Sequence, residues 1–553
     1  MDKNIKKINA RTITLTILFV LILVVIALLI GKFTYSYLAP TVSDDVEGAG
    51  EVTASGDTII FTKGNTLSLS ATTDNFKTNG GNLTATTNPK VKLMASSKTN
   101  SASSKYFAGI IIKNNTYSYT TTDKKPEIIL TVKDENGKIV ESSADNLTFV
   151  TVNDNLKGFD ITGVNGAFNI VTDHVIATSS NKSEVIHTWT FTLTFVNLGT
   201  DQSNNENSTL NMDVVLQKDK IPTTIVEVCS NNDKLSDCII NSYEKLGLLY
   251  HHDLSLLTGA GDNSYRYAGA NPNNYVCFGS DEATCPTENL YRIIGVIDGK
   301  VKLIHAYGVT ADMLGTNEGY VKTYKEAYGS YSSYYKGNGD LTKVGIYQWN
   351  KTGYNTWSTS TTNTINLNTN YLTYLDSKNA KWKNMIADTT WYVGGMNYNG
   401  YRSNAKTAYD YEVGANKDAT TVISKIGLMY VSEYYYGANP DYWMLPGYDT
   451  NGHQNEAGTA WIGEDYSKAY NYNWMSTGLL EWTLSLNSDN PTSFVFYVNV
   501  VGSVRFIGVY DSLGLAVRPS FSLSSSIKFT SGEGTAVNPI RITNWRTVLI
   551  KPL

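Results

Sequence analysis

The chain is poor in charged residues and has no run of basic ones. Of its 553 residues 17% are Asp, Glu, Lys or Arg, and 41% are hydrophobic. Residues 1–40 hold five of the 45 basic and one of the 50 acidic residues, which leaves 40 against 49 and a net charge of −9. Neutralising phosphates requires concentrated Lys and Arg, so we expect no nucleic-acid partner. A polar, weakly charged surface favours an extracellular β-rich protein over a cytosolic enzyme.

The sequence also lacks the short motifs that mark common catalytic sites. It contains no phosphate-binding loop, no nucleophile elbow and no Ser-His-Asp arrangement. His174 and His187 stand alone, and there is no His-Glu-x-x-His segment of the kind that metallopeptidases use. We therefore expect no enzyme activity and no catalytic residue.

Cysteines are few, and the four present form two close pairs, Cys229 with Cys238 and Cys277 with Cys285. Thiols outside the cell are usually oxidised, so two local disulfides are favoured among the three possible connectivities. Zinc is the alternative. Structural zinc sites prefer gaps of about two to four residues, whereas these gaps are eight and seven residues long.

Charge is absent from Ile13 to Ile30, a run in which only Thr14 and Thr16 are polar. Eighteen helical residues span ~27 Å, about one bilayer core. Four basic residues precede the run and Lys32 follows it. This charge bias predicts a cytoplasmic tail at 1–12, a transmembrane helix at 13–31 and an extracellular stalk at 32–57. A cleaved signal peptide is the alternative, and both place the rest of the chain outside.

Residues 58–217 show strand patterns. In "HTWTFTLTF" the residues Trp189, Phe191, Leu193 and Phe195 alternate with threonines, as in a half-buried strand. "EIILTVKDENGKIV" predicts a hairpin that turns at Asn136-Gly137. No segment of this region has convincing helical periodicity. The pattern favours an antiparallel β-sandwich of immunoglobulin or jelly-roll type.

The character of the chain changes after a linker at 218–226. "DKLSDCIINSYEKLG" predicts a helix with Leu235, Ile239, Tyr243 and Leu246 on one face and Gly247 at its C-cap. "YRIIGVIDGKVKLI" predicts a hairpin around Asp298-Gly299, and "YLTYLDSKNAKWKNMI" a further helix. This pattern predicts an α+β domain at residues 227–545, followed by a C-terminal tail at 546–553.

Several segments of this domain resemble the C-type-lectin-like superfamily, in the branch of formylglycine-generating enzymes and their non-catalytic surface relatives. They are "GLLEWTLSLN", "FYVNVVGSVRF" and "LGLAVRPSFSL". With "YRYAGANPNNYVCFG", "IGLMYVSEY" and "SIKFTSGEGTAVNPIRI", they are similar to a domain of surface proteins in low-GC Gram-positive bacteria. The resemblance covers about half the chain and implies a C-type-lectin-like α+β fold. The catalytic branch needs cysteines late in the domain, and none follows Cys285.

The resemblance also assigns Glu481 and Trp482 to the structural core rather than to catalysis. A buried carboxylate without a partner is costly, and we expect Arg518 to pair with Glu481. The N-terminal half more loosely resembles the TasA and camelysin group of secreted β-sandwich proteins, through its apolar N-terminal segment and the Asn/Thr-rich strands that end in "NMDVVLQ".

Aromatic residues crowd residues 434–474 and supply the ligand-binding candidates. Tyr and Trp present flat apolar faces with a polar tip, which suits sugar rings and protein contacts, although most of these rings are expected to pack within the fold. "GANPDYW" resembles the Glu-Pro-Asn calcium and sugar loop of C-type lectins, but it is also favourable turn chemistry. The candidates are Asn439, Asp441, Trp443, Trp461, Tyr472 and Trp474.

No cofactor is expected, although calcium is an open alternative. Asp441, Asp449, Asn451, Asn455 and Glu456 could supply oxygen ligands for it. The adjacent His251, His252 and Asp253 are more consistent with a helix-end or surface role than with a metal site, since neighbouring histidines on a helix point apart.

Together these patterns predict a surface-anchored binding or adhesion protein, single-pass in the membrane, whose ligand is an extracellular glycan or a host or matrix protein. The alternative is a structural subunit of a surface fibre or envelope layer, joined through exposed strand edges of residues 58–217. An enzyme is the least favoured class.

Overall fold

The computed structural model describes residues 50–52, 57–98, 101–205, 208–401, 403–443, 473–490, 493–509 and 514–544. The chain forms two compact units. The first consists of residues 1–65, 89–104 and 175–188, and the second of residues 66–88, 105–174 and 189–553.

The first unit contains a four-stranded antiparallel sheet. Part of the predicted stalk, Gly50–Val52, forms its outer strand β1. Ile59, Val91 and Leu93 are buried, so the sheet hides one face, as period-two strands do. In spatial order the strands are β1 (Gly50–Val52), β2 (Thr58–Thr62), β5 (Lys90–Met94) and β11 (Glu184–Thr188).

The N-terminal part of the second unit contains two further sheets. One has the order β10 (Gly166–Ala177), β6 (Ser103–Lys113), β13 (Leu210–Gln217), β3 (Leu67–Leu69). The other has the order β4 (Leu83–Thr87), β12 (Thr190–Phe195), β7 (Ile128–Lys133), β9 (Leu156–Asp160), β8 (Phe149–Asn153). Short helical turns α2 (Thr73–Phe76) and η1 (Ser203–Asn205) lie between strands.

The alternation predicted around β12 is confirmed. Trp189, Phe191, Leu193 and Phe195 are all buried, and the Trp189 indole N–H donates to the Tyr106 hydroxyl of β6 over 2.8 Å. The predicted turn at Asn136-Gly137 is also present. The Gly137 N–H donates to the Asp134 carbonyl, and a φ of 76° at Gly137 explains the glycine there.

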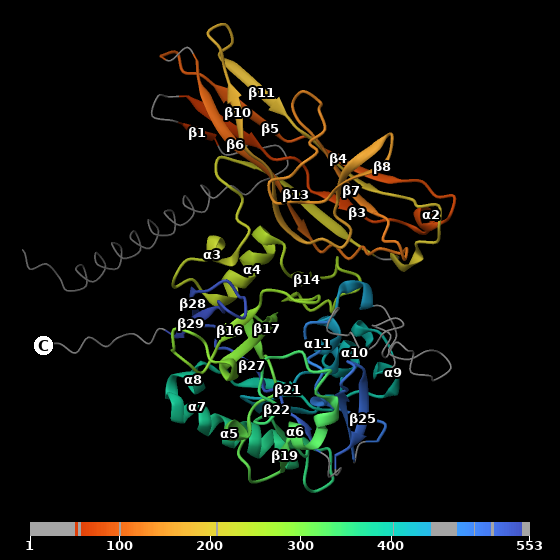
Figure 1. Ribbon diagram of the computed structural model, residues 1–553, viewed down its shortest axis with the longest axis vertical. Coiled ribbons are helices and arrows are strands. Elements are labelled where there is room, and N and C mark those ends of the chain that lie inside the picture. Colours follow the sequence, from red (N-terminus) through yellow and green to blue (C-terminus); the bar gives the residue numbers. More distant parts are fainter. Residues whose placement is uncertain are drawn as a thin grey trace, which may run out of the picture. The chain divides into compact units, whose positions relative to one another are not determined.

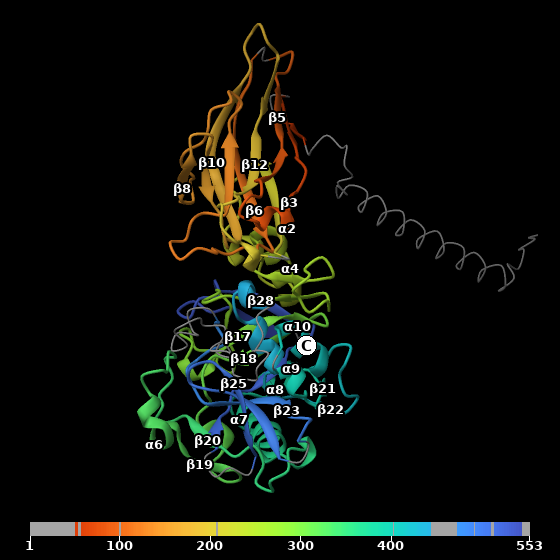
Figure 2. The ribbon, with the colours of Figure 1, turned by 90° about the vertical axis from the view of Figure 1, so that its right-hand side faces the viewer.

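The C-terminal part of the second unit is built on two six-stranded sheets (Figures 1 and 2). The first runs β14 (Tyr250–His252), β15 (Ser264–Arg266), β17 (Leu290–Ile297), β18 (Lys300–His305), β27 (Ser520–Ser522), with β16 (Tyr275–Cys277) also paired to β17. The second runs β19 (Tyr320–Thr323), β20 (Gly345–Tyr347), β26 (Leu515–Ala516), β23 (Glu481–Leu486), β24 (Phe494–Val498), β25 (Val504–Gly508). Strand β27, from the C-terminal end of the chain, pairs with β18, which lies between it and β17.

Short helices and two small two-stranded sheets complete this region. The paired strands are β21 (Thr389–Tyr392) with β22 (Thr421–Ser424), and β28 (Ile527–Ser531) with β29 (Arg541–Asn544). The α-helices are α3 (Ile225–Val228), α4 (Leu235–Leu246), α5 (Ala311–Leu314), α6 (Tyr324–Tyr328), α7 (Leu372–Lys378), α8 (Ala380–Met385), α9 (Tyr398–Tyr401), α10 (Ala405–Glu412) and α11 (Val431–Tyr436). A π-helix, η5 (Thr362–Tyr371), leads into α7.

The local predictions for this region hold in two places and need one revision. Helix α4 ends at Leu246, with Gly247 as a left-handed C-cap, and β17 and β18 form the predicted hairpin. The segment from Tyr371 to Ile386 is not one helix. Asn379 adopts an extended backbone that separates α7 from α8, and its side chain accepts a hydrogen bond from the Lys381 N–H.

Two predictions are wrong: the fold class, a transmembrane helix followed by an all-β sandwich and an α+β C-type-lectin-like domain, and the single-pass membrane location. The described chain consists mainly of β-sheets, and none of the helices in its described ranges is long and apolar enough to cross a bilayer. The predicted transmembrane helix, residues 13–31, lies outside the described residues, as do the tails at 1–12 and 546–553. Both predicted disulfides, Cys229–Cys238 and Cys277–Cys285, are present and fit an extracellular protein.

Candidate ligand-binding site

A cavity of about 240 Å³ opens in the C-terminal part of the second unit. We call it the Trp474 pocket, after the sequence-predicted ligand contact that lines it. Its lining includes Tyr275, Arg292, Tyr307, Lys336, Trp474 and Thr477.

The first sheet places two of these side chains opposite each other. Tyr275 of β16 pairs directly with Arg292 of β17 in the antiparallel register, and Tyr307 lies two residues beyond the end of β18. Trp474 comes from a distant segment. Its backbone N–H donates to the Gly269 carbonyl over 2.8 Å, and its indole N–H donates to the Tyr267 carbonyl over 3.0 Å. Both hydrogen bonds fix the ring before any ligand arrives.

Arg292 lies between two aromatic rings. Its guanidinium carbon is 4.4 Å from the centroid of the Tyr275 ring and 4.6 Å from that of the Trp474 ring. Both separations fall within the ~6 Å range of cation–π attraction. The Arg292 side chain also donates to the Asn274 amide oxygen and to the carbonyls of Pro272 and Trp474, at 2.7, 2.9 and 3.3 Å.

Tyr307 is held neutral over a wide pH range. Burial raises the pKa of its hydroxyl to about 12, and the neighbouring Tyr275 reinforces the shift. The pocket therefore combines the neutral Tyr307 phenol, hydroxyls such as that of Thr477, and fixed aromatic rings. Such a lining can contact a polar ring-shaped ligand on its apolar face and at its hydroxyl groups.

The other predicted contacts do not gather there. Trp443 is 0% exposed, and its ring packs against Tyr250, His252 and Tyr436, so the prediction that it faces a ligand is wrong. Its indole N–H donates to the Ala438 carbonyl over 3.0 Å, as in a packed core. Asn439 opens the 3₁₀ turn η6 (Pro440–Tyr442), which matches the turn chemistry considered for this loop.

The remaining candidates are outside what the structure describes. Trp461 and Tyr472 lie outside the described residues, as do the calcium candidates Asp449, Asn451, Asn455 and Glu456, and the side chain of Asp441 is also not described. Calcium binding by this loop therefore stays a prediction.

Glu481 and Arg518 form the expected pair. Glu481 is 0% and Arg518 1% exposed, and the Arg518 Nη1 lies 3.2 Å from both carboxylate oxygens. Arg518 also donates to the carbonyls of His305 and Met475, each over 2.9 Å. Trp482 is equally buried, and its indole N–H donates to the Tyr347 carbonyl over 2.7 Å. The pairing of Glu481 with Arg518 is confirmed, and its structural role stays a prediction.

The histidines noted in the sequence have separate environments. His251 and His252 are consecutive on β14. His251 stacks on Tyr265 at a centroid distance of 4.2 Å, whereas His252 is buried. Because strand neighbours point to opposite faces, the two rings diverge.

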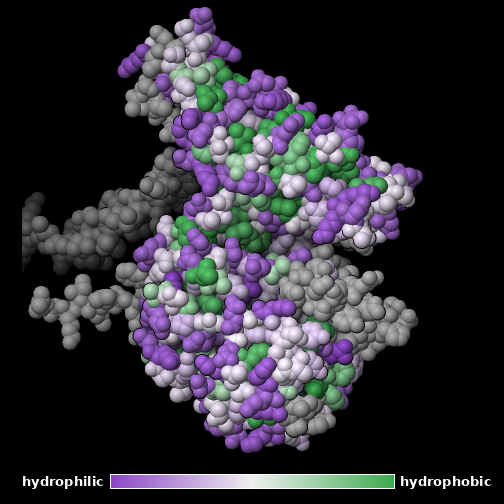
Figure 3. All heavy atoms as spheres, in the orientation of Figure 1, coloured by the Kyte–Doolittle hydropathy of each residue, from purple (hydrophilic) through white to green (hydrophobic). Residues whose placement is uncertain are grey.

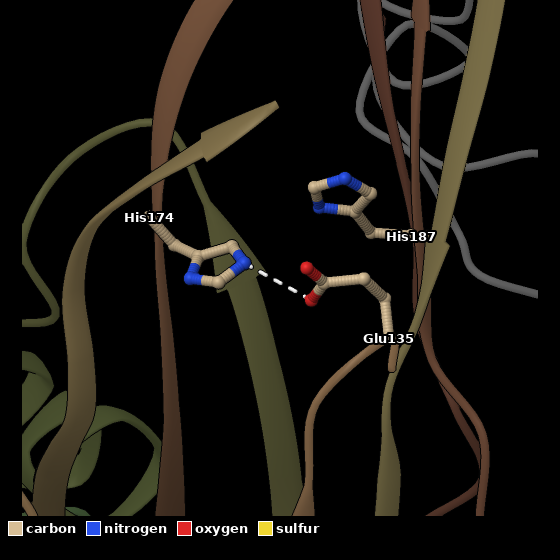
Figure 4. A group of neighbouring side chains, drawn as sticks. All are labelled: Glu135, His174 and His187. Atoms are coloured by element: carbon tan, nitrogen blue, oxygen red, sulfur yellow. Dashed lines mark hydrogen bonds and ion pairs between the residues drawn. The ribbon is translucent and has the colours of Figure 1, made fainter. Parts of the chain in front are cut away.

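In the β-rich half of the second unit, His174 has a partner after all. Its Nε2 lies 3.0 Å from the Glu135 carboxylate (Figure 4), and its ring packs edge-on against Tyr106 and Trp189. His187 lies on β11 of the first unit.

Sequence reasoning missed the buried charges of this region. Arg292, Lys302, Glu412 and Glu433 are all buried. Glu412 accepts hydrogen bonds from the backbone N–H groups of Val431 and Ser432, at the start of α11. No spacing rule joins such residues, since their partners lie up to 182 positions away in the case of Arg292.

Comparison of the sequence with protein-family models and with curated proteins gave no match.

Proposed function

We propose that this chain is an extracellular binding protein that holds a carbohydrate in the Trp474 pocket. The observation that carries the proposal is the pocket's lining, in which Tyr275, Tyr307 and Trp474 surround a small cavity together with hydroxyl and amide groups. Sugars offer apolar C–H faces to aromatic rings and hydroxyl groups to polar side chains. The resemblance to C-type-lectin-like surface domains supports the same class of ligand by analogy alone.

Size and surface character support a small polar ligand. The cavity of about 240 Å³ is below the ~300–1,000 Å³ typical of pockets for drug-sized molecules, so it fits one sugar unit at the end of a chain. The visible face of the C-terminal region is mainly purple and pale, with small separate green areas (Figure 3). This face therefore does not present an extended apolar contact surface.

The test is a glycan array probed with the full chain, followed by titration of the best ligand. Tyr275→Ala removes a ring from the pocket and is expected to weaken binding at least tenfold. Tyr354→Ala is the matched control, because Tyr354 is 59% exposed and is not among the pocket's lining residues. Absence of any glycan ligand, or equal binding by both variants, would reject the proposal.

A structural-subunit role has one observation in its favour. Strand β11 ends the described sheet of the first unit, and Ile186 on it is 48% exposed. An exposed strand edge with an apolar residue can pair with another chain. Ordered multimers in electron micrographs that disappear in Ile186→Lys would favour this function.

A further inference from the structure

The charged residues that line the Trp474 pocket are all basic within the described chain. Arg292 and Lys336 are the charged residues among those that line it, and no Asp or Glu of the described chain does so. Lys336 is exposed at the rim, and its ammonium lies 3.5 Å from the Ser333 carbonyl. Arg292 is only 5% exposed.

Four Lys and Arg side chains are buried in the described chain, and Arg292 differs from the other three. Arg266 pairs with Asp262 at 2.5 Å, Lys302 with Glu433 at 2.5 Å and Arg518 with Glu481 at 3.2 Å. No described carboxylate forms an ion pair with Arg292. The domain thus neutralises its buried cations with carboxylates, except where the cation borders a cavity.

The environment of Arg292 makes an external anion favourable. Burial lowers the pKa of its guanidinium to about 10, and the charge of Arg518 adds to that effect. A buried ion without a counter-ion is costly, because a low-dielectric surrounding replaces water. The cation–π attraction of the Tyr275 and Trp474 rings offsets part of this desolvation cost, and an anion bound in the pocket would offset more of it.

Arg292 also has hydrogen-bonding capacity to spare. A guanidinium has five N–H donors, and three of them have protein acceptors: Asn274, Pro272 and the Trp474 backbone. One N–H therefore remains on each terminal nitrogen. A guanidinium can donate from two nitrogens to the two oxygens of one carboxylate, which is the strong bidentate mode of arginine recognition.

We propose that the Trp474 pocket selects an acidic sugar, and that Arg292 binds the carboxylate of that sugar while the aromatic rings contact its ring. This inference rests on the proposed function, because it names the class of carbohydrate that the same pocket takes. Uronic acids and sialic acids share the required chemistry, a carboxylate attached directly to a six-membered sugar ring.

The experiment compares matched ligands on the full chain by isothermal titration. Oligosaccharides that end in glucuronate or in N-acetylneuraminate are titrated beside their carboxyl-reduced, neutral counterparts. The acidic forms are expected to bind at least tenfold more tightly, with an advantage that shrinks as salt rises. The two acidic ligands distinguish the sources, and preference for either one supports the inference.

Arg292→Met keeps an unbranched apolar side chain between the rings and removes the charge. It is expected to abolish the preference for acidic sugars, so that acidic and carboxyl-reduced ligands bind this variant with equal affinity. Lys336→Gln should reduce the preference less, and Lys322→Gln, an exposed lysine outside the pocket, should not change it.

The outcomes separate the two proposals. Equal affinity of the intact protein for acidic and neutral ligands overturns this inference and leaves carbohydrate binding in place. If the intact protein binds no sugar at all, both proposals are overturned. The ligand comparison uses the intact protein, so the test remains even if the Arg292→Met protein fails to fold. If that variant folds and still prefers acidic sugars, the inference is also overturned.

Discussion

Replacing Glu481 by Gln tests whether the pair with Arg518 holds the domain together. The amide has nearly the same shape as the carboxylate and can still accept a hydrogen bond from the Arg518 Nη1. Only the negative charge is lost. Arg518, at 1% exposure, then becomes a buried cation without a counter-ion.

The expected loss follows from the geometry. At 3.2 Å, unit charges attract by about 5 kcal/mol with an effective dielectric constant of about 20. Removing one partner of a buried pair typically costs about 3–5 kcal/mol, and we expect Glu481→Gln to fall in that range. Replacing both partners, as Glu481→Leu with Arg518→Met, should cost much less, because no unpaired charge remains.

Urea unfolding followed by tryptophan fluorescence measures these differences. Glu318→Gln is the matched control. Its partner Lys351 lies at the same kind of distance, 2.9 Å, but both side chains are about half exposed, so the change should stay below about 1 kcal/mol. A Glu481→Gln protein as stable as Glu318→Gln would refute the structural role. If that stable protein had also lost a chemical activity, the enzyme class would be reopened.

Three further predictions concern stability. Trp482→Ala and Trp443→Ala, each removing a buried ring, should lower the free energy of unfolding by ~3–5 kcal/mol, and thermal melts with unchanged midpoints would contradict this. Replacing Cys277 and Cys285 by Ser should cost about 2–3 kcal/mol, the value for so short a loop, whereas free thiols in the purified protein would show that the bridge does not form. Burial raises the pKa of Glu412 from 4.5 to about 7, so the folded state keeps a proton that the unfolded chain releases, and this carboxyl's contribution to stability falls as pH rises from 4.5 to 7. Glu412→Gln should remove about 2 kcal/mol of that fall between pH 5 and 7.5 in urea titrations, and parallel curves for both proteins would contradict the shift.

Local patterns in the sequence were enough for the elements that depend on neighbours in the chain. The alternation from Trp189 to Phe195 determines a strand with one buried face, because successive strand residues point to opposite sides. Gly247 marks the end of α4, because a left-handed C-cap favours glycine. The two disulfides likewise join cysteines only nine and eight positions apart. Glu481 and Arg518 were paired through a resemblance, not through such a local rule.

Tertiary structure alone decided which aromatic rings are accessible and where charge is unbalanced. Trp443 and Trp474 occupy equally aromatic stretches, yet one is enclosed by three rings and the other lines a cavity. In the sequence, Arg292 is a single basic residue within a predicted apolar strand. Its placement between Tyr275 and Trp474 depends on the pairing of β16 with β17 and on a segment 182 positions away. Burial and electrostatic balance are sums over contacts from the whole fold, so no window of sequence contains them.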